Sequence, residues 1–227
     1  MAARRRGVSV LVLLEGGPVG GITREEEVTC AALNQSGIPL FRMTTTAAAH
    51  ARYRYNHAKY LVIDGEALLI STENFGFRGY PPPGTKGNRG WGAFIEDPGV
   101  AGYFREVFST DLRGGDVIPY APSKKEEFPS PTLIPFSSRF PPLRVTGVDV
   151  TPVLSPDTSD EVLSLLSRAE ERIEIEQASI RNTSALQLDP FFSAAVNASR
   201  RGVTVRILLD GSRYNDEGPA DNDEMAD

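Results

Sequence analysis

Long apolar runs, cysteine pairs and an excess of basic charge are all missing from this sequence. No run approaches the ~20 apolar residues that a membrane-spanning helix needs. The single cysteine, Cys30, excludes an internal disulfide, and we expect it to be a buried thiol on an amphipathic helix. The net charge of −6 argues against a general nucleic-acid binder, whose surface is usually basic. What remains is an ordinary globular composition.

The usual cofactor and nucleotide signatures are missing as well. There is no dinucleotide fingerprint and no G-x-S-x-G elbow, and the segment G-T-K-G-N-R-G lacks the Ser or Thr that a P-loop requires after its lysine. The chain has only two histidines, His50 and His57, and neither has a zinc-like spacing to Cys30. We therefore expect no cofactor and no bound metal. We expect His50 to be an ordinary loop residue.

An internal repeat indicates the architecture. Residues 5–17 read R-R-G-V-S-V-L-V-L-L-E-G-G, and residues 200–212 read R-R-G-V-T-V-R-I-L-L-D-G-S, at an offset of 195. An apolar run that ends in an acid and a glycine is typical of a buried parallel strand followed by a loop. The repeat predicts two copies of one α/β lobe. It also favours a core strand, rather than a signal peptide, for the N-terminal apolar run.

The two copies differ in what precedes them. Only six residues precede Gly7 of the first copy. Gly202 of the second copy, by contrast, follows four predicted segments: a strand-like segment at 144–154, a helical pattern at 157–172, an alternating run at 173–180 and a helix at 189–202. We therefore predict three regions. They are the C-terminal portion of a first lobe at 1–112, a Pro-rich connector at 113–145 and the N-terminal portion of a second lobe at 146–227, with a loop or frayed end from Asp216 onward.

The segment Y-N-H-A-K-Y-L-V-I-D, residues 55–64, carries one of the two histidines and one of only four lysines. The two-residue period of a strand puts His57 and Lys59 on one face. Asp64 and Gly65 form a two-residue turn signal, after which A-L-L-I-S-T runs back as the second strand of a hairpin.

A two-residue loop sets the register of that hairpin. It places His57 opposite Thr72 and Lys59 opposite Ile70, with Asn74 next along the same face. The imidazole, ammonium, hydroxyl and carboxamide would then converge, which suits an anionic tetrahedral group. The plain alternative is a sheet strand with a hydrogen-bonded histidine and an extended lysine. The combination of all four groups favours a functional site.

These residues resemble the signature of the phospholipase D superfamily, H-x-K-x4-D-x6-G-S-x-N. This sequence shows His57, Lys59 and Asp64, followed by Ser71-Thr72-Glu73-Asn74. Ser71 replaces the usual Gly, and Thr72 replaces the usual Ser. The segment G-N-R-G-W-G-A-F-I-E-D-P-G-V-A-G-Y-F is similar to the strand and helix that follow in the family. There, Gly90 stands where the family has a glutamate that helps to orient a catalytic histidine.

The resemblance implies a fold, a mechanism and a set of roles. The fold is α/β, a phospholipase D-like mixed sheet flanked by helices, here as two incomplete homologous lobes. The activity is metal-independent phosphodiester hydrolysis or transphosphatidylation through a phosphohistidine. His57, Lys59 and Asp64 would be catalytic, with Asp64 fixing local geometry. Lys59, Thr72 and Asn74 would bind the substrate.

Such enzymes bring two HKD motifs together, and this chain contains one. At the repeat offset, the second histidine would fall near position 252, roughly 25 residues past Asp227. We expect the second motif to come from missing C-terminal sequence of a longer protein or from a homodimer partner. We expect a phosphodiester substrate, with a phospholipid favoured over nucleic acid. A nuclease of the same superfamily and an inactive binding module, which Gly90 makes plausible, are the alternatives. The sequence predicts no compartment.

A loop rich in aromatic and basic residues, 74–92, leaves three interpretations open. Its four rings are interleaved with Arg78, Lys86 and Arg89. Such a loop can lie at a lipid interface, stack on nucleic acid or pack its rings on itself.

Overall fold

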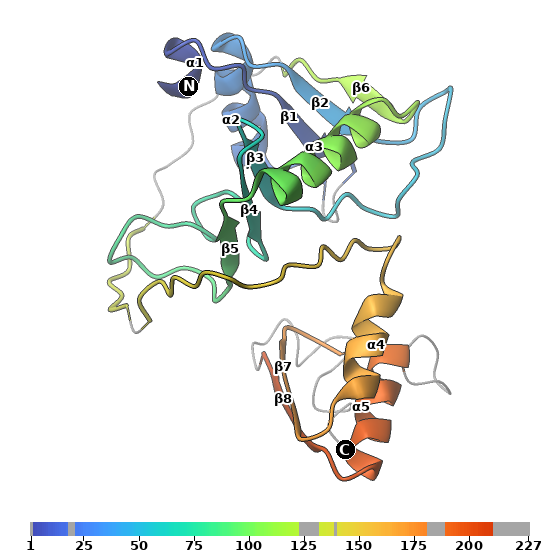
Figure 1. Ribbon diagram of the computed structural model, residues 1–227. Coiled ribbons are helices and arrows are strands. Elements are labelled where there is room, and N and C mark those ends of the chain that lie inside the picture. Colours follow the sequence, from blue (N-terminus) through green and yellow to red (C-terminus); the bar gives the residue numbers. More distant parts are fainter. Residues whose placement is uncertain (1, 18–20, 123–131, 139, 181–188, 211–227) are drawn as a thin grey trace. The chain divides into compact units, whose positions relative to one another are not determined.

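The computed structural model describes residues 2–17, 21–122, 132–138, 140–180 and 189–210 (Figure 1). The chain forms two compact units, Met1–Val148 and Asp149–Asp227, which are described separately below. The predicted acidic tail from 216 lies outside the described residues. None of the described helices is long and apolar enough to cross a membrane.

The first unit contains a small mixed sheet with strand order β1-β2-β6. β1 (Val12–Glu15) runs parallel to β2 (Leu40–Met43), and β6 (Val117–Pro119) is antiparallel to β2. The connecting helix, α2 (Arg24–Gln35), begins at an N-cap threonine, Thr23, whose hydroxyl accepts a hydrogen bond from the Glu26 amide at 3.2 Å. Three glutamates in its first turn also stabilise the helix, because their negative charges interact favourably with the helix dipole. β6 lies within the predicted connector, which therefore contributes to this sheet.

Cys30 lies on α2, is 3% exposed and packs against Ile38 and Leu40, as the sequence predicted. Burial raises the pKa of the Cys30 thiol, and the nearby Glu26 carboxylate raises it further. Because the thiolate is the reactive form, we expect iodoacetamide to alkylate Cys30 at least about tenfold more slowly in the folded chain than in urea. Intact-mass spectrometry over a time course measures both rates. Equal rates would contradict a buried thiol.

A second, antiparallel sheet in the same unit carries the predicted hairpin. It has the order β3-β4-β5, with β3 (Tyr60–Ile63), β4 (Ala67–Ser71) and β5 (Gly92–Ile95). Helix α3 (Pro98–Leu112) begins at Asp97, whose carboxylate accepts a hydrogen bond from the Val100 amide at 2.8 Å. α3 packs on β3 and β4, and the Tyr60 and Phe104 rings meet edge to face at 5.3 Å. Leu68 of β4 is fully buried.

The hairpin register differs by one residue from the prediction. Ile63 pairs with Ala67 and Tyr60 with Ile70, so the loop contains three residues, Asp64 to Glu66, rather than two. Asp64 and Gly65 both adopt left-handed backbone, at φ 54° and 73°. The predicted pairing of Lys59 with Ile70 is therefore wrong. Because side chains alternate between faces, a shift of one residue changes which residues share a face.

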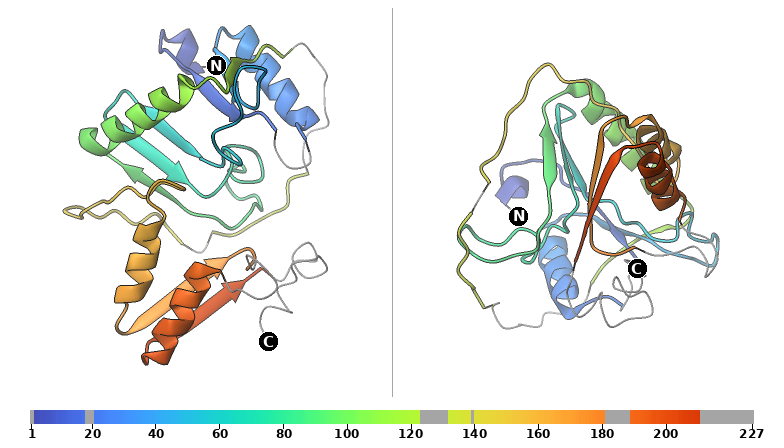
Figure 2. Two further views of the ribbon diagram at one scale, coloured as in Figure 1. Left: turned by 90° about the vertical axis from the view of Figure 1, so that its right-hand side faces the viewer. Right: turned by 90° about the horizontal axis from the view of Figure 1, so that it is seen from below.

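The second unit places two helices along a pair of parallel strands. Figure 2 shows α4 (Asp160–Arg168) and α5 (Pro190–Arg200) together along β7 (Arg172–Gln177) and β8 (Thr204–Leu209). The core contains Ile173, Ala198 and Val203. The two predicted helices and the run at 173–180 are found near their expected places. The predicted strand at 144–154 is wrong, because this segment pairs with no described strand and Val145 is 61% exposed.

Both copies of the repeat share one local structure. Two residues after the end of α1 (Ala2–Arg5) and of α5 comes a glycine at positive φ. The apolar residue after each glycine donates its amide back to the last helical turn. The matching bonds are Gly7 N–H to Arg4 O at 3.0 Å, Val8 N–H to Ala3 O at 3.2 Å, Gly202 N–H to Ser199 O at 2.9 Å and Val203 N–H to Ala198 O at 3.1 Å. The first run then becomes β1 and the second β8. The observed class is mixed α/β, as expected; the assignment of the two units to homologous lobes stays a prediction.

Candidate active site

Four of the five predicted site residues lie at one end of the β3–β4 hairpin. His57 and Lys59 immediately precede β3, and Thr72 and Asn74 immediately follow β4. The Lys59 ammonium donates a hydrogen bond to the His57 carbonyl oxygen at 2.7 Å. The Ser71 amide donates to the Lys59 carbonyl oxygen at 2.9 Å, which fastens this segment to the end of β4. The histidine and the lysine are therefore held together by the backbone of the hairpin.

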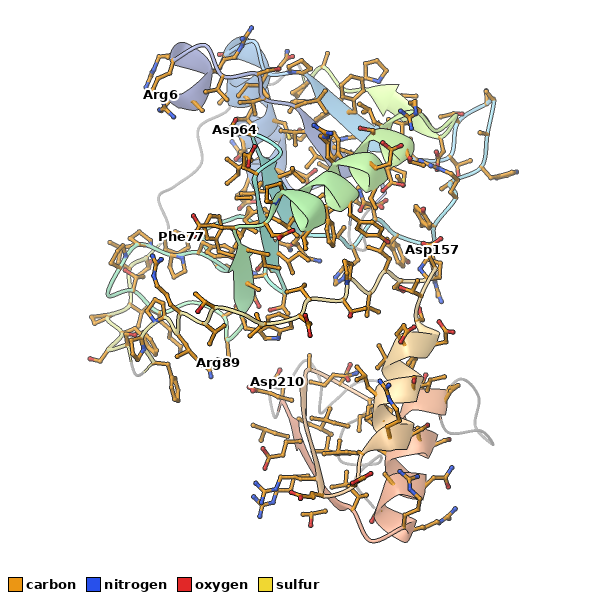
Figure 3. All side chains as sticks on the ribbon, in the orientation of Figure 1. Arg6, Asp64, Phe77, Arg89, Asp157 and Asp210 are labelled. Carbon is orange, nitrogen blue, oxygen red and sulfur yellow. The ribbon has the colours of Figure 1, made fainter. Side chains whose placement is uncertain are left out.

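Asp64 lies at the opposite end of the hairpin, in the turn (Figure 3). The four residues of β3, at about 3.3 Å each, separate it from the segment that carries His57. The structure therefore does not bring the Asp64 carboxylate to the other four side chains. Its backbone at φ 54° shapes the turn, which is a local role.

The polar side chains after β4 have different surroundings. The Thr72 hydroxyl donates to the Trp91 carbonyl oxygen at 3.2 Å and accepts from the Trp91 amide at 3.0 Å. It therefore ties β4 to the beginning of β5. Asn74 is exposed, and its backbone carbonyl accepts a hydrogen bond from the Gly76 amide at 2.8 Å.

Glu15 also contributes to the candidate site, although the sequence predicted no role for it. It is the last residue of β1, and its carboxylate accepts a hydrogen bond from the Asn56 amide at 2.6 Å and another from the Gly17 amide at 2.7 Å. It therefore anchors the chain one residue before His57 to the other sheet of the unit. The sequence feature that could have pointed to Glu15 is the acid followed by a glycine at the end of each apolar run of the repeat.

Electrostatics couple the histidine and the lysine. Burial lowers the pKa of His57, and the positive charge of Lys59 lowers it further. Burial also lowers the pKa of Lys59, whereas the negative charge of Glu73 opposes that change. A lowered histidine pKa favours a neutral imidazole with a free lone pair at neutral pH. Such a group can attack phosphorus while the neighbouring ammonium binds phosphate oxygens.

The aromatic and basic loop is partly packed and partly exposed. Phe75 and Tyr80 stack at 5.5 Å, and the Tyr80 hydroxyl donates to the Ser71 hydroxyl at 2.6 Å. Trp91, by contrast, is 67% exposed. Figure 3 shows that Arg89 belongs to the loops beyond the hairpin end opposite Asp64. Two rings thus pack on each other, while Trp91 stays accessible.

Fold and site together define an α/β domain with an imidazole and an ammonium group at one end of a β-hairpin. Within the described part of the chain, no three His, Cys, Asp or Glu side chains gather closely enough to hold a metal ion. Residues 1–112 match the family model described as cardiolipin synthase, PLD-like domain. Through this domain, the chain belongs to the phospholipase D superfamily.

No curated protein sequence matches the chain. Among solved structures, the chain is similar to a phospholipase D family member, Nuc from Salmonella typhimurium, with 20% sequence identity and a TM-score of 0.41. That match covers 52% of this chain and 68% of the other.

Proposed function

We propose that this chain provides one half of a phosphodiester hydrolase or transferase site of the phospholipase D type, with His57 as the nucleophile. The observation that carries the proposal is the His57–Lys59 pair, in which burial and the ammonium charge favour a neutral imidazole. A neutral imidazole has the lone pair that attack on phosphorus needs. Lys59 and Asn74 bind phosphate oxygens, while Thr72 and Asp64 maintain the local geometry.

The reaction proceeds in two displacements. The His57 ring nitrogen attacks phosphorus and forms an N–P bond, and the bond to the leaving oxygen breaks. That oxygen takes a proton from the histidine of a second HKD motif, supplied by a second copy of the chain or by further sequence. Water, or an alcohol, then attacks the phosphohistidine with the same second histidine as base, which frees His57.

A phospholipid is the favoured substrate. The matching family model is named for cardiolipin synthase, and cardiolipin is a phospholipid. The exposed Trp91, in the same loop of the sequence as Arg78 and Lys86, suits a lipid–water interface with anionic head groups. The nuclease of the same superfamily is the second candidate, and it is supported by the same rings and cations, which also suit single-stranded nucleic acid.

The test is an activity assay on the full-length protein with three substrates and EDTA throughout. We expect hydrolysis of bis-p-nitrophenyl phosphate and of phosphatidylglycerol vesicles, and little hydrolysis of single-stranded DNA. Because His57 must be neutral and its pKa is lowered, the rate should stay high as the pH falls to 6.5 and decline below that value. Loss of activity in EDTA would contradict the metal-independent mechanism. Preferred cleavage of DNA would favour the nuclease, and no turnover of any substrate would favour the binding module.

A further inference from the structure

Glu73 carries a carboxylate for which the sequence predicted no role. It follows β4 directly, next to Thr72, and is half-buried. Its side chain lies over two glycines that come from the loop and from the segment before β5. A Cβ atom on Gly90 would lie 2.6 Å from Glu73 Oε1 and 2.9 Å from Cδ, and a Cβ atom on Gly79 would lie 2.9 Å from Glu73 Cβ. Any side chain at Gly90 would therefore displace the carboxylate.

Hydrogen bonds hold Glu73 in place at both its carboxylate and its backbone amide. The Asn88 side-chain amide donates to Glu73 Oε2 at 3.0 Å. The Glu73 amide donates to the Ser71 hydroxyl at 2.8 Å, and that hydroxyl also accepts the bond from Tyr80 at 2.6 Å. Both the backbone and the carboxylate of Glu73 therefore have defined partners, which fixes the direction of the side chain.

The charge of Glu73 acts on Lys59. The Ser71 amide donates a hydrogen bond to the Lys59 carbonyl oxygen at 2.9 Å, and Glu73 follows Ser71 by two residues, as a diagonal neighbour of Lys59 across the hairpin does. The negative charge of Glu73 raises the pKa of Lys59 against the effect of burial. Lys59 in turn acts on His57. The Lys59 ammonium itself donates a hydrogen bond to the His57 carbonyl oxygen at 2.7 Å. The charge of Glu73 therefore affects Lys59, and the charge of Lys59 affects the His57 imidazole.

We propose that Glu73 is a positioning residue whose carboxylate balances the charge of Lys59 next to His57, and that Gly90 is without a side chain in order to admit it. The catalytic consequence rests on the proposed function, whereas the placement of the charge does not. Gly90, together with the lack of a second HKD motif in this sequence, makes an inactive chain plausible. The space over Gly90 is occupied by a carboxylate from the neighbouring strand end, so the site does contain one.

The first experiment measures the Lys59 ammonium directly. The chain has four lysines, so NMR titration of 13C-labelled lysine gives few signals, and a Lys59→Arg variant assigns one of them. We expect Glu73→Gln, which retains the shape of the side chain, to lower the pKa of Lys59. The matched control is Glu66→Gln in the turn at the other end of the hairpin, which should leave it unchanged. An unchanged Lys59 pKa in Glu73→Gln would overturn the proposal, whether or not the protein is active.

The second experiment moves the carboxylate from position 73 to position 90. We expect Glu73→Ala to lower kcat by about ten- to a hundredfold, as for other residues that orient an active-site group. Gly90→Glu alone should also lose activity, because its side chain competes with Glu73 for one space. The double variant Glu73→Ala/Gly90→Glu should recover most of the lost kcat and restore the Lys59 pKa. A double variant no better than the worse single variant in both measurements would overturn the proposal. If no variant turns over a phosphodiester, the proposed function fails and the lysine titration still decides the role of Glu73.

Discussion

Replacing His57 with asparagine is expected to lower phosphodiester turnover by at least about 10⁴-fold, because a nucleophile that forms the covalent intermediate has no substitute in the site. Asparagine retains a polar side chain of similar reach but cannot form a stable bond to phosphorus. The measurement is kcat/KM on bis-p-nitrophenyl phosphate. Because Lys59 is hydrogen-bonded to the backbone carbonyl at position 57, the variant should keep that contact and the fold.

The matched control for this prediction is His50, the other histidine of the chain. It lies in the loop between β2 and β3, as the sequence predicted, so His50→Asn should retain full activity. Rapid quenching at alkaline pH, followed by mass spectrometry, should detect a covalent phosphoryl adduct on the peptide that carries His57. Turnover in His57→Asn within tenfold of the parent chain would rule out His57 as the nucleophile.

Replacing Asp116 with alanine is expected to lower the free energy of unfolding by about 3 kcal/mol, because it leaves the Arg52 backbone amide and guanidinium Nε without their buried carboxylate acceptor. Asp116 is fully buried between α3 and β6. Its carboxylate accepts hydrogen bonds from the Arg52 backbone amide at 2.7 Å and from the Arg52 guanidinium at 2.8 Å. This pair joins the loop after β2 to the segment before β6.

The same interaction makes stability depend on pH in a defined direction. Burial by itself raises the pKa of Asp116, but the hydrogen bonds and the charge of Arg52 outweigh it and hold that pKa below its usual range. The stabilisation is therefore fully present above about pH 4, the ordinary value for an unfolded aspartate, and is lost as the pH falls through the lower folded value. Urea unfolding of both chains between pH 7 and pH 3 measures this effect. The difference between parent and Asp116→Ala should shrink as the pH falls.

Glu106→Ala provides the control for the aspartate experiment. Glu106 forms an ion pair with Arg113 at 3.2 Å, but both side chains are mostly exposed. An exposed pair of this kind contributes at most about 1 kcal/mol, so this variant should unfold close to the parent. If Asp116→Ala loses no more stability than Glu106→Ala, the buried pair does not hold these segments together.

Local chemistry let the sequence predict several elements correctly. Asp189 and Pro190 at the start of α5, and Gly202 after its end, act within one turn of the helix, so their effect does not depend on the rest of the fold. The apolar runs that became β1 and β8 are recognisable for the same reason, and they repeat at a fixed offset. The His57 and Lys59 spacing is likewise a property of one continuous segment.

Features that depend on partners distant in the chain needed the tertiary structure. The loop at Asp64 contains three residues, Asp64 to Glu66, and the Asp-Gly turn signal by itself does not specify that length. The segment at 144–154 has strand-like residues, yet a strand also needs a partner to satisfy its backbone groups. Asp116 meets Arg52 across 64 positions of sequence, and Glu15 meets Asn56 across 41.

The sequence by itself determined the α/β class, the repeat and the His-Lys pair, because these follow from periodicity and from groups that are neighbours along one strand. Only the tertiary structure decided where the carboxylates of this unit lie relative to that pair. It placed Glu73 over Gly90, kept Asp64 at the far end of the hairpin and brought Glu15 to the residue before His57. The physical reason is that a charge acts through space, and the distances between charges are set by packing and register rather than by position in the chain.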